Sequence, residues 1–202
     1  MSTTFFKSEK IVFYRFVFFI GLLSIILLKC SKFNKPGPTL PTVSNFEEDN
    51  QGWRISENSE NTVPEYSTSG GNPGGYIYTT DRLSNAWYFV ASTRFANEVK
   101  KGYGKTLYFD LKQSATDAQY DADDVILTDG TIVLTFDTAY NPSTTWTHYS
   151  IKLDELSGWK KGASEATGTD IQAVLQNLTE LKIRGEFRTG PDTGGLDNAI
   201  IE

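Results

Sequence analysis

The sequence predicts an all-β fold in which two antiparallel sheets pack face to face as a β-sandwich. Aromatic residues make up 13% of the 202 residues and the chain contains 17 glycines, a balance that favours many strands joined by tight turns. Apolar and polar residues alternate along several segments, as they do in strands with one buried and one solvated face. Turn-forming residues separate these segments, which is typical of a sandwich or a barrel.

The alternation is clearest in four segments between residues 105 and 187. The alternating apolar residues are Leu107, Phe109 and Leu111; Ile132, Leu134 and Phe136; Tyr149, Ile151 and Leu153; and Leu181 and Ile183, with Phe187 on the same phase. Clusters of Gly, Asn, Asp and Pro occur at 70–75, 129–130, 141–142 and 192–195. Each of these clusters is predicted to form a turn between strands.

One segment near the C-terminus has the spacing of a helix. Its apolar residues are Ile171, Val174, Leu175 and Leu178. Thr169 or Asp170 is a suitable N-cap for such a helix, because a short polar side chain can accept a hydrogen bond from the first turn. The sequence therefore predicts one short helix over residues 170–177, covering an end of the sandwich.

Residues 1–29 are predicted to be a signal peptide. Basic residues precede an uncharged apolar run of 13 residues, 16–28, which is typical of a secretory signal and shorter than the about 20 residues of a membrane span. The segment Leu27-Leu28-Lys29-Cys30 resembles the end of a bacterial lipoprotein signal. That resemblance implies that Cys30 is acylated and becomes the mature N-terminus. The alternative is an uncleaved signal anchor, since Lys29 stands where lipoprotein signals have a small residue.

Residues 30–44 are predicted to be a lipid-anchored linker, and residues 45–202 a single folded domain. Pro36, Pro38 and Pro41 favour extended backbone without internal hydrogen bonds, hence a semi-rigid spacer. The order of signal, cysteine, spacer and domain predicts an extracytoplasmic protein held at the outer membrane or cell surface.

The composition argues against nucleic-acid binding and against catalysis. The formal net charge is −6, whereas phosphate contacts need clustered Lys and Arg. His148 is the single histidine and Cys30 the single cysteine, and no Gly-x-Ser-x-Gly segment accompanies them. A glycosidase that uses paired carboxylates, for example from the acidic cluster at 121–124, is the remaining enzymatic alternative. Because 25 acidic residues produce such pairs by chance, we predict no catalytic residue.

The four tryptophans are candidates for stacking on sugar rings. Trp53, Trp87 and Trp146 are predicted to pack in the core. Trp159 follows a glycine and precedes Lys160-Lys161-Gly162, which has the character of a loop. Trp159 is therefore the candidate ligand-binding residue.

An ordered set of short segments throughout residues 45–202 resembles the laminin B domain, also called laminin IV type A. The segments are Phe46-Glu47 with Gly52-Trp53, Gly74 to Ile77, Trp87 to Ala91, Tyr103 to Leu111, Asp124 to Leu127, Leu181 to Phe187 and Leu196 to Ile200. The chain lacks the cysteine-rich repeats that flank this domain in laminins, so the resemblance supports the module and not a laminin-like trimer. It implies a jelly-roll sandwich related to galactose-binding-like and carbohydrate-binding modules.

The resemblance implies binding without catalysis, and it leaves two hypotheses open. The first is a surface module for adhesion to, or recognition of, an extracellular protein or glycan. The alternative is a carbohydrate-binding module that captures polysaccharide. A row of exposed aromatic residues over a concave sheet would favour the alternative, and a flat polar surface would favour the first.

The resemblance also implies a structural calcium ion near the ends of the domain. Glu47 on the opening strand and Asp197 on the closing strand would meet if these strands pair. The glycines of 70–75 would let backbone carbonyls turn inward, and Asp81 is a third candidate carboxylate. Calcium prefers such mixtures of carboxylate and carbonyl oxygens. The alternative is that Glu47 and Asp197 cap strands or pair with basic residues.

Overall fold

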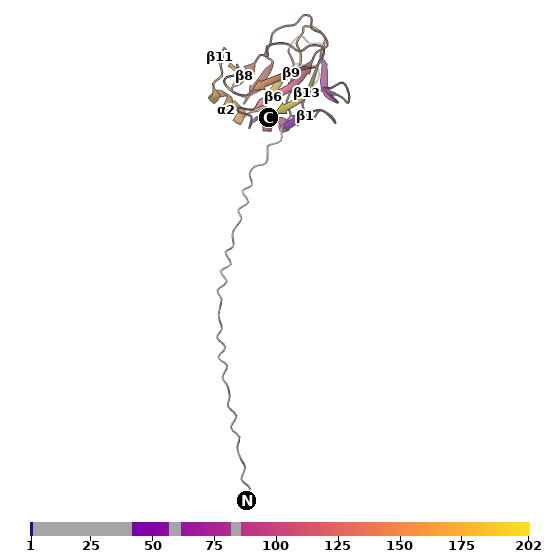
Figure 1. The fold of residues 1–202 in the computed structure, drawn as a ribbon. Helices are drawn as coiled ribbons and strands as arrows, with labels where there is room; N and C mark the ends of the chain where they lie inside the picture. Colours follow the sequence, from indigo (N-terminus) through magenta and orange to yellow (C-terminus); the bar gives the residue numbers. More distant parts are fainter. Residues whose placement is uncertain (2–41, 57–61, 82–85) are drawn as a thin grey trace. The chain divides into compact units, whose positions relative to one another are not determined.

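The described residues form two antiparallel sheets and two short helices (Figure 1). The computed structural model describes residues 1, 42–56, 62–81 and 86–202. Cys30 and the predicted signal peptide from residue 2 onward lie outside the described residues. No helix in the described ranges is both long enough and apolar enough to cross a membrane.

Sheet A has the strand order β3-β4-β13-β6-β9, and β1 pairs with the end of β13. Its strands are β1 (Thr42–Ser44), β3 (Glu65–Ser67), β4 (Tyr76–Asp81), β6 (Thr106–Lys112), β9 (Thr147–Lys152) and β13 (Asp192–Ile201). Residues 42–44, which the sequence analysis assigned to the linker, are thus part of the sheet. They pair with residues 199–201 of β13, so the fold includes Thr42–Ser44.

Sheet B has the strand order β11-β10-β8-β7-β12-β5-β2. Its strands are β2 (Arg54–Ile55), β5 (Tyr88–Val90), β7 (Val125–Thr128), β8 (Val133–Phe136), β10 (Lys160–Lys161), β11 (Ser164–Glu165) and β12 (Glu180–Arg184). The predicted β-sandwich is therefore confirmed. First and last strands also lie side by side, as the resemblance implied, because β1 pairs with β13 (Figure 1).

The core lies between the two sheets. Leu107, Phe109 and Leu111 of β6 are at most 3% exposed and alternate with residues on the outer face, as period 2 predicts. The facing residues of sheet B include Leu127 and Ile183, which are fully buried. Burying this apolar surface is the main favourable contribution to folding.

Helix α2 (Gly168–Gln176) is the predicted helix, but it begins earlier than expected. Its N-cap is Thr167, whose side chain accepts a hydrogen bond from Asp170 N, while the Asp170 side chain accepts one from Thr167 N. This reciprocal capping box fixes the start of the helix.

The prediction of a single helix was wrong, because α1 (Thr93–Val99) also forms. Ser92 caps it by accepting a hydrogen bond from Phe95 N at 3.3 Å. Phe95, Ala96 and Val99 turn toward the core. Because the helix has only about two turns, its apolar pattern consists of these residues alone, which is too short a pattern to predict a helix.

The turn predicted at 192–195 was also wrong, because these residues begin β13, the longest strand. A Cβ atom on Gly194 would lie 2.0 Å from the Gly185 carbonyl oxygen, so glycine allows the two backbones to pack closely. Gly195 points to the outer face, where the side chain of Lys112 lies over it. The glycines here allow close packing on both faces of β13 instead of forming a turn.

Candidate functional site

Two buried carboxylates lie next to each other on the outer face of sheet A. Asp197 of β13 is opposite Asp110 of β6, and the two residues are 0% and 3% exposed. The loop at 70–75 covers them: Asn72 N donates to Asp197 Oδ2 at 2.6 Å, and Asn72 Nδ2 donates to Asp110 Oδ2 at 3.1 Å. Asn198 N donates to Asp197 Oδ1 at 2.7 Å. The predicted ligand Asp197 is therefore held in place by neutral donors.

Glu47 and several backbone carbonyls approach the same loop. Gly75 N donates to Glu47 Oε2 at 3.3 Å. A Cβ atom on Gly74 would lie 2.2 Å from Glu47 Oε1, and one on Gly75 would lie 2.1 Å from the Phe46 carbonyl oxygen. A Cβ atom on Gly71 would lie 2.2 Å from the Gly75 carbonyl oxygen. The glycines thus admit a concentration of carboxylate and carbonyl oxygens that other residues would exclude.

The backbone on both sides of this oxygen cluster is strained. Phe46, just before Glu47, has φ +49°, and Asn198, just after Asp197, has φ +50°. Both are non-glycine residues in the left-handed region, which costs about 1–3 kcal/mol and is found most often at functional sites. The register of β13 against β6 also shifts after Asp197, and such a bulge re-aims the neighbouring side chains.

Asp197 and Glu47 carry negative charge without an ion-pair partner among the described residues, whereas Asp110 lies 2.7 Å from His148 Nδ1. Burial raises the pKa of Asp197 to about 6, hydrogen bonds from Asn72 and Asn198 oppose the rise, and the charges of Asp110 and Glu47 add to it. Among the ion pairs of the described residues, none includes Asp197 or Glu47. Pairing with Lys or Arg, one part of the predicted alternative, is therefore not seen among the described residues. The other part, in which the two carboxylates cap strands, stays open, because both accept hydrogen bonds from backbone N–H groups.

Asp81 does not belong to this cluster. Leu196 pairs with Ile77, which places Asp197 opposite Tyr76, whereas Asp81 pairs with Asp192 at the far end of the same two strands. Five residues of strand separate Asp81 from Tyr76, a distance of about 16 Å. The backbone register thus contradicts Asp81 as a third ligand, and its side chain is outside the described set.

No three His, Cys, Asp or Glu side chains of the described residues are grouped so that they could hold a metal ion on their own. A cation at the cluster would need carbonyl oxygens as well as Glu47 and Asp197. Calcium accepts such mixed ligand sets, whereas metals that prefer nitrogen or sulfur do not fit an all-oxygen cluster. The residues present therefore fit calcium.

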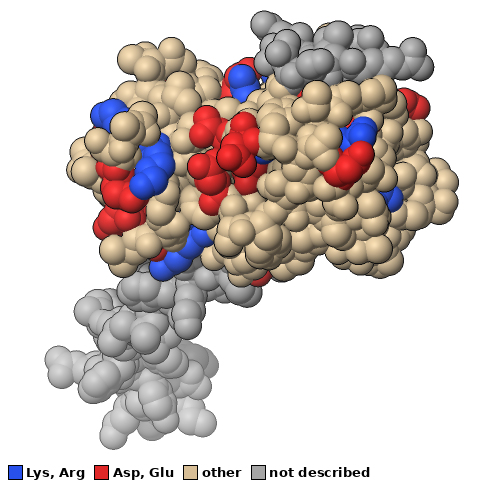
Figure 2. Space-filling view, turned by 90° about the horizontal axis from the view of Figure 1, so that it is seen from above, with Lys and Arg blue, Asp and Glu red and all other residues tan. Residues whose placement is uncertain are grey.

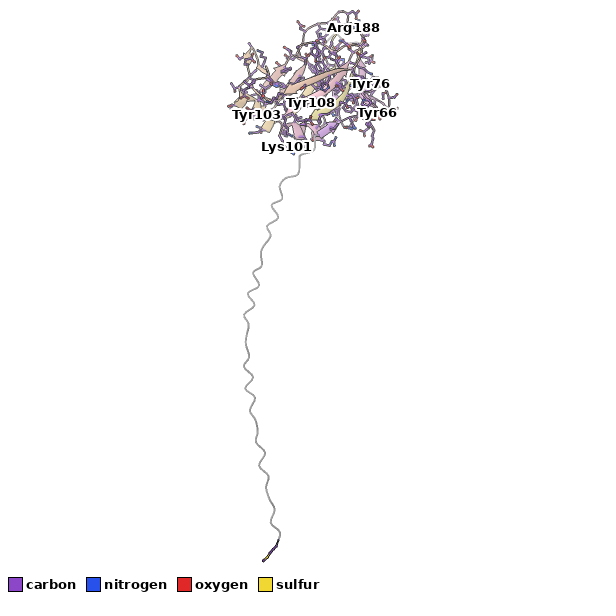
Figure 3. The ribbon with its side chains drawn as sticks, in the orientation of Figure 1. Tyr66, Tyr76, Lys101, Tyr103, Tyr108 and Arg188 are labelled. Atoms are coloured by element: carbon purple, nitrogen blue, oxygen red, sulfur yellow. The ribbon has the colours of Figure 1, made fainter. Side chains whose placement is uncertain are left out.

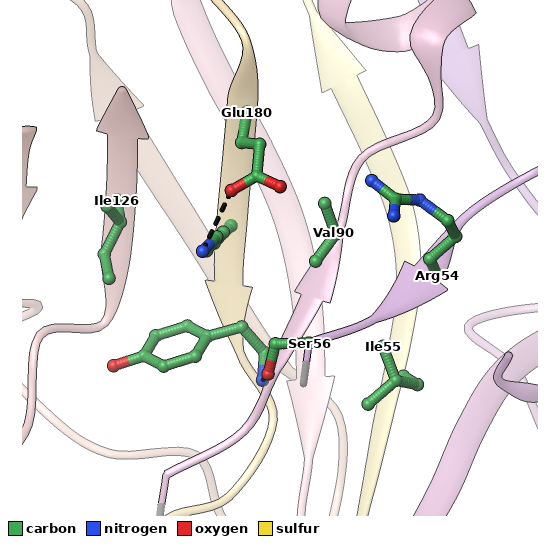
Figure 4. A pocket seen from close by; sticks show the side chains of 8 residues that line it. Arg54, Ile55, Ser56, Val90, Ile126 and Glu180 are labelled. Carbon is green, nitrogen blue, oxygen red and sulfur yellow. Dashed lines mark hydrogen bonds and ion pairs between the residues drawn. The ribbon is translucent and has the colours of Figure 1, made fainter. Parts of the chain in front are cut away.

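The outer face of sheet B is hollowed (Figure 4). The hollow has a volume of about 370 Å³ and is lined by Arg54, Ile55, Ser56, Tyr88, Val90, Ile126, Glu180 and Lys182. The floor of the hollow is formed by four residues that lie side by side on neighbouring strands: Arg54 pairs with Val90, Val90 with Lys182, and Lys182 with Ile126. Lys182 Nζ lies 2.9 Å from Glu180 Oε2. Charged groups of both signs therefore surround apolar side chains.

A second hollow of about 330 Å³ adjoins the first along β5 and β12, since Arg184 lines it and pairs with Tyr88 of the first. Its other lining residues are Asp121, Ala122, Asp123, Asp124, Asp137, Thr138 and Asn141. Burial and the nearby charges of Asp123 and Asp124 raise the pKa of Asp137. Figure 2 shows acidic side chains gathered near the middle of the face seen from above.

The tryptophans differ from expectation in two places. Trp159 is only 1% exposed, and its indole N–H donates to the Lys152 carbonyl oxygen at 2.9 Å, so the prediction of a ligand-binding Trp159 was wrong. Trp146, predicted to lie in the core, is half-buried on the outer face of sheet A. Trp53 and Trp87 are buried as predicted.

His148 is exposed on β9, and its Nδ1 lies 2.7 Å from Asp110 Oδ1. Its ring stacks on Tyr108 with ring centroids 5.8 Å apart. This contact could not be predicted from the sequence, because it depends on the register that places His148 opposite Asp110.

Solved structures with a similar fold include domains of two kinds. The L4b domain of human laminin alpha-2 matches with a TM-score of 0.55 and 11% identity, covering 80% of this chain and 97% of that one. A family 11 carbohydrate-binding module of Clostridium thermocellum cellulase Lic26A-Cel5E matches with a TM-score of 0.52 and 13% identity, covering 80% of this chain and 93% of that one. At these identities the likeness shows the fold.

Curated relatives are laminin subunits. Laminin subunit gamma-1 of Xenopus tropicalis is 26% identical over 151 residues, which is 72% of this chain and 9% of that protein. Laminin subunit gamma-1 of Homo sapiens is 25% identical over 172 residues, or 78% and 10%. The chain thus spans about a tenth of the length of these relatives. The profile of Laminin B (Domain IV) matches residues 88–202, more than half of the chain, and the chain therefore belongs to this family.

Proposed function

We propose that this chain is a non-catalytic binding module that captures a glycan in the hollow on the outer face of sheet B. The observation that carries the proposal is the lining of that hollow. Arg54 and Lys182 are donors and Glu180 is an acceptor, and they surround the apolar side chains of Val90 and Ile126. A sugar offers hydroxyl groups that both donate and accept, arranged around apolar ring faces. Such a ligand suits a concave site with a few polar groups over an apolar floor.

The hollowed shape favours the glycan-capture hypothesis over adhesion through a flat polar surface. One of the similar folds, with a TM-score of 0.51 and 12% identity, is a family 11 carbohydrate-binding module in complex with a beta-1,3-1,4-mixed-linked tetrasaccharide. The likeness concerns the fold, and the choice of ligand class rests on the hollow of this chain. Recognition of an extracellular protein is the competing function.

A glycan array probed with the domain from Thr42 onward tests the proposal. We expect binding to a small set of glycans, weakened about tenfold by Arg54→Ala and by Lys182→Ala, since each removes a hydrogen bond between a charged group and a ligand hydroxyl. Lys101→Ala is the control, because Lys101 lies outside the hollow and pairs with Glu98 on the surface. Binding that is equal in all three variants would place the site elsewhere, and binding to proteins alone would support adhesion.

The proposed location is outside the cytoplasm, with the domain tethered to a membrane by a lipid on Cys30. The order of basic residues, apolar run, cysteine and proline-rich spacer supports this proposal. Stable attachment needs more than one acyl chain, because a single chain binds membranes only marginally. A metabolic fatty-acid probe should label the wild type and not Cys30→Ser, and equal labelling of both would contradict the anchor.

We also propose that Glu47, Asp197 and neighbouring backbone carbonyls hold a structural calcium ion. The support is an oxygen cluster that contains the buried Asp197, no ion pair of Asp197 or Glu47 among the described residues, and glycines that allow close approach. When bound, the ion would neutralise charge that the fold otherwise leaves uncompensated. A calcium titration of chelator-treated protein tests the proposal, with one saturable site expected and none in Asp197→Asn.

A further inference from the structure

A third hollow lies on the outer face of sheet A, on the opposite side of the sandwich core from the hollow lined by Arg54 and Lys182. One register row crosses this sheet from Glu65 through Tyr78 and Gly195 to Lys112. Leu111 pairs with Thr147, which places Trp146 next to Lys112 in the same row. Because Gly195 has no side chain, the row forms a trough between Tyr78 on β4 and the Lys112 and Trp146 side chains.

The trough has aromatic walls. The rings of Tyr76 and Tyr78 are 5.5 Å apart between centroids, and those of Tyr76 and Trp146 are 5.3 Å apart at 81°. All three side chains are half-buried, so each keeps part of its ring surface in contact with solvent. Figure 3 shows Tyr76 at one side of the sandwich, well separated from Tyr103.

The ammonium group of Lys112 fixes these walls in place. Its Nζ lies 3.8 Å from the centroid of Tyr76 and 4.3 Å from that of Trp146. Lys112 Nζ and Trp146 Nε1 both donate to the Gly70 carbonyl oxygen at 3.0 Å. Cation–π contacts of this kind favour a fixed arrangement of the rings. The ammonium group of Lys112 thus already contacts two aromatic rings and one carbonyl oxygen. We therefore expect Lys112 to hold the rings in position and to bind an anion poorly.

The lining shows which ligand the trough suits. The trough has a volume of about 240 Å³ and is lined by Tyr76, Tyr78, Lys112, Gln113, Ser114, Thr144, Thr193 and Gly195. The lining has hydroxyl and amide groups beside flat apolar rings, and it includes no carboxylate. Preformed ring surfaces bury apolar area with little loss of side-chain entropy.

We infer that this trough is a second glycan-binding site, which stacks the ring of a neutral sugar on Tyr76 and Tyr78. A sugar ring has apolar faces for the aromatic walls and hydroxyl groups for Ser114, Thr144 and Thr193. An uncharged ligand fits because the one cation of the lining is already engaged. The inference goes beyond the proposed function, since the trough and the hollow of sheet B share no residue.

Tryptophan fluorescence provides a readout that is specific for this trough. Trp53, Trp87 and Trp159 are at most 1% exposed, whereas Trp146 is half-buried and packs against Tyr76 of the trough, with ring centroids 5.3 Å apart. The hollow of sheet B contains no tryptophan. A ligand that enters the trough should therefore change the emission of Trp146, and a ligand confined to the other hollow should not.

The experiment titrates the domain from Thr42 with soluble neutral polysaccharides, namely mixed-linked β-glucan, xylan and galactomannan, and with polygalacturonate as a charged probe. We expect a saturable change in emission with at least one neutral polysaccharide. Tyr78→Ala should weaken this binding about tenfold, because it removes one stacking surface. Tyr78→Phe should keep it, because the Tyr78 hydroxyl donates to Glu65 and the ring supplies the stacking surface.

Controls separate this site from the proposed function. The double variant Arg54→Ala/Lys182→Ala should leave the Trp146 response unchanged, and all variants should have the melting temperature of the wild type. The inference fails if no neutral polysaccharide changes the emission, if Tyr78→Ala binds as the wild type does, or if only polygalacturonate responds. A response that disappears in the double variant would also overturn it, since the signal would then arise from the hollow of sheet B.

Discussion

Arg184 is a charged residue whose side chain is only 1% exposed. Its Nε donates to the Glu186 carbonyl oxygen at 2.6 Å, and its Nη2 donates to the Tyr120 carbonyl oxygen at 2.7 Å. Its Nη1 lies 3.3 Å from Asp124 Oδ1, and its guanidinium plane packs 4.4 Å from the ring centroid of Phe187. A planar group with five donors can satisfy all these partners at once. Arg184 thereby joins β12 to the loop that precedes β7.

We predict that Arg184→Ala lowers the free energy of unfolding by about 3–5 kcal/mol, because it leaves the charge of Asp124 buried without its partner. Arg184→Lys should also be destabilising, since an ammonium group keeps the charge but cannot reach the same set of carbonyls. Urea unfolding at equilibrium measures both effects. A loss below about 1 kcal/mol for Arg184→Ala, the range of exposed ion pairs, would show that the pair contributes little.

At the level of single residues, burial was the property that the sequence predicted least well. Trp159 lies in a segment with loop character but fills the core, where its ring packs 5.3 Å from that of Phe136. Trp146 precedes β9, in which Tyr149 and Ile151 are buried, but its own side chain lies on the outer face of sheet A, next to Lys112. Both outcomes depend on pairing between distant strands, which no local pattern contains.

At the level of elements, α2 depends on its capping box. Thr167 Oγ1 accepts from Asp170 N at 3.2 Å, and Asp170 Oδ2 accepts from Thr167 N at 3.0 Å. We predict that Thr167→Ala destabilises the domain by about 1 kcal/mol, the typical effect of losing an N-cap. Thr169→Ala is the control, because Thr169 is exposed within the first turn. Thermal unfolding compares the two, and equal melting temperatures would contradict a stabilising cap.

The same capping box predicts a pH dependence. A hydrogen bond from Lys161, followed by those from Thr167, lowers the pKa of Asp170 to about 2. A carboxyl with a depressed pKa stabilises the fold above its unfolded pKa of about 3.9 and loses that contribution as the pH falls toward its folded pKa. The difference in stability between wild type and Asp170→Asn should therefore be constant above pH 5 and shrink between about pH 4 and 2. A constant difference down to pH 2 would contradict this coupling.

Elements with long, regular patterns were predictable, and elements defined by distant partners were not. Strand β6 follows from its alternation over residues 105–112, and α2 from its apolar spacing. The Gly194-Gly195 pair in β13 was mistaken for a turn, because its role is to let Gly185 on one face and Lys112 on the other approach the strand. The pattern Ser92, Phe95, Ala96, Val99 marks α1 in retrospect, with a cap followed by apolar residues on one face.

At the level of the whole molecule, the order of segments along the chain predicted the architecture. The closing strand returns beside the opening one. Glu47 follows the opening strand instead of lying on it, and its negative charge helps to raise the pKa of Asp197. Asp81 failed as a partner because an antiparallel strand carries it away from Tyr76. The approach of Glu47 to Asp197 depends on chain topology and was predictable. The separation of Asp81 from Asp197 depends on strand register and was not.

The proposed calcium ion should stabilise the whole domain, because its ligands connect the first and last segments of the fold. An ion at a hundredfold excess over its dissociation constant adds about 2.7 kcal/mol. For a domain of this size that corresponds to a rise in melting temperature of about 5–10 °C. Differential scanning calorimetry of the domain from Thr42, with excess calcium and then with chelator, measures this shift.

Asp197→Asn provides the sharper comparison, because its effect should depend on the ion. With calcium, the variant should melt below the wild type, since it loses a charged ligand. With chelator, it should melt at the same temperature or higher, because the wild type then buries a carboxylate that has no cationic partner. Ser150→Ala, an exposed position on β9, is the control and should respond to calcium as the wild type does. If wild type and Asp197→Asn shift equally on adding calcium, Asp197 does not bind the ion.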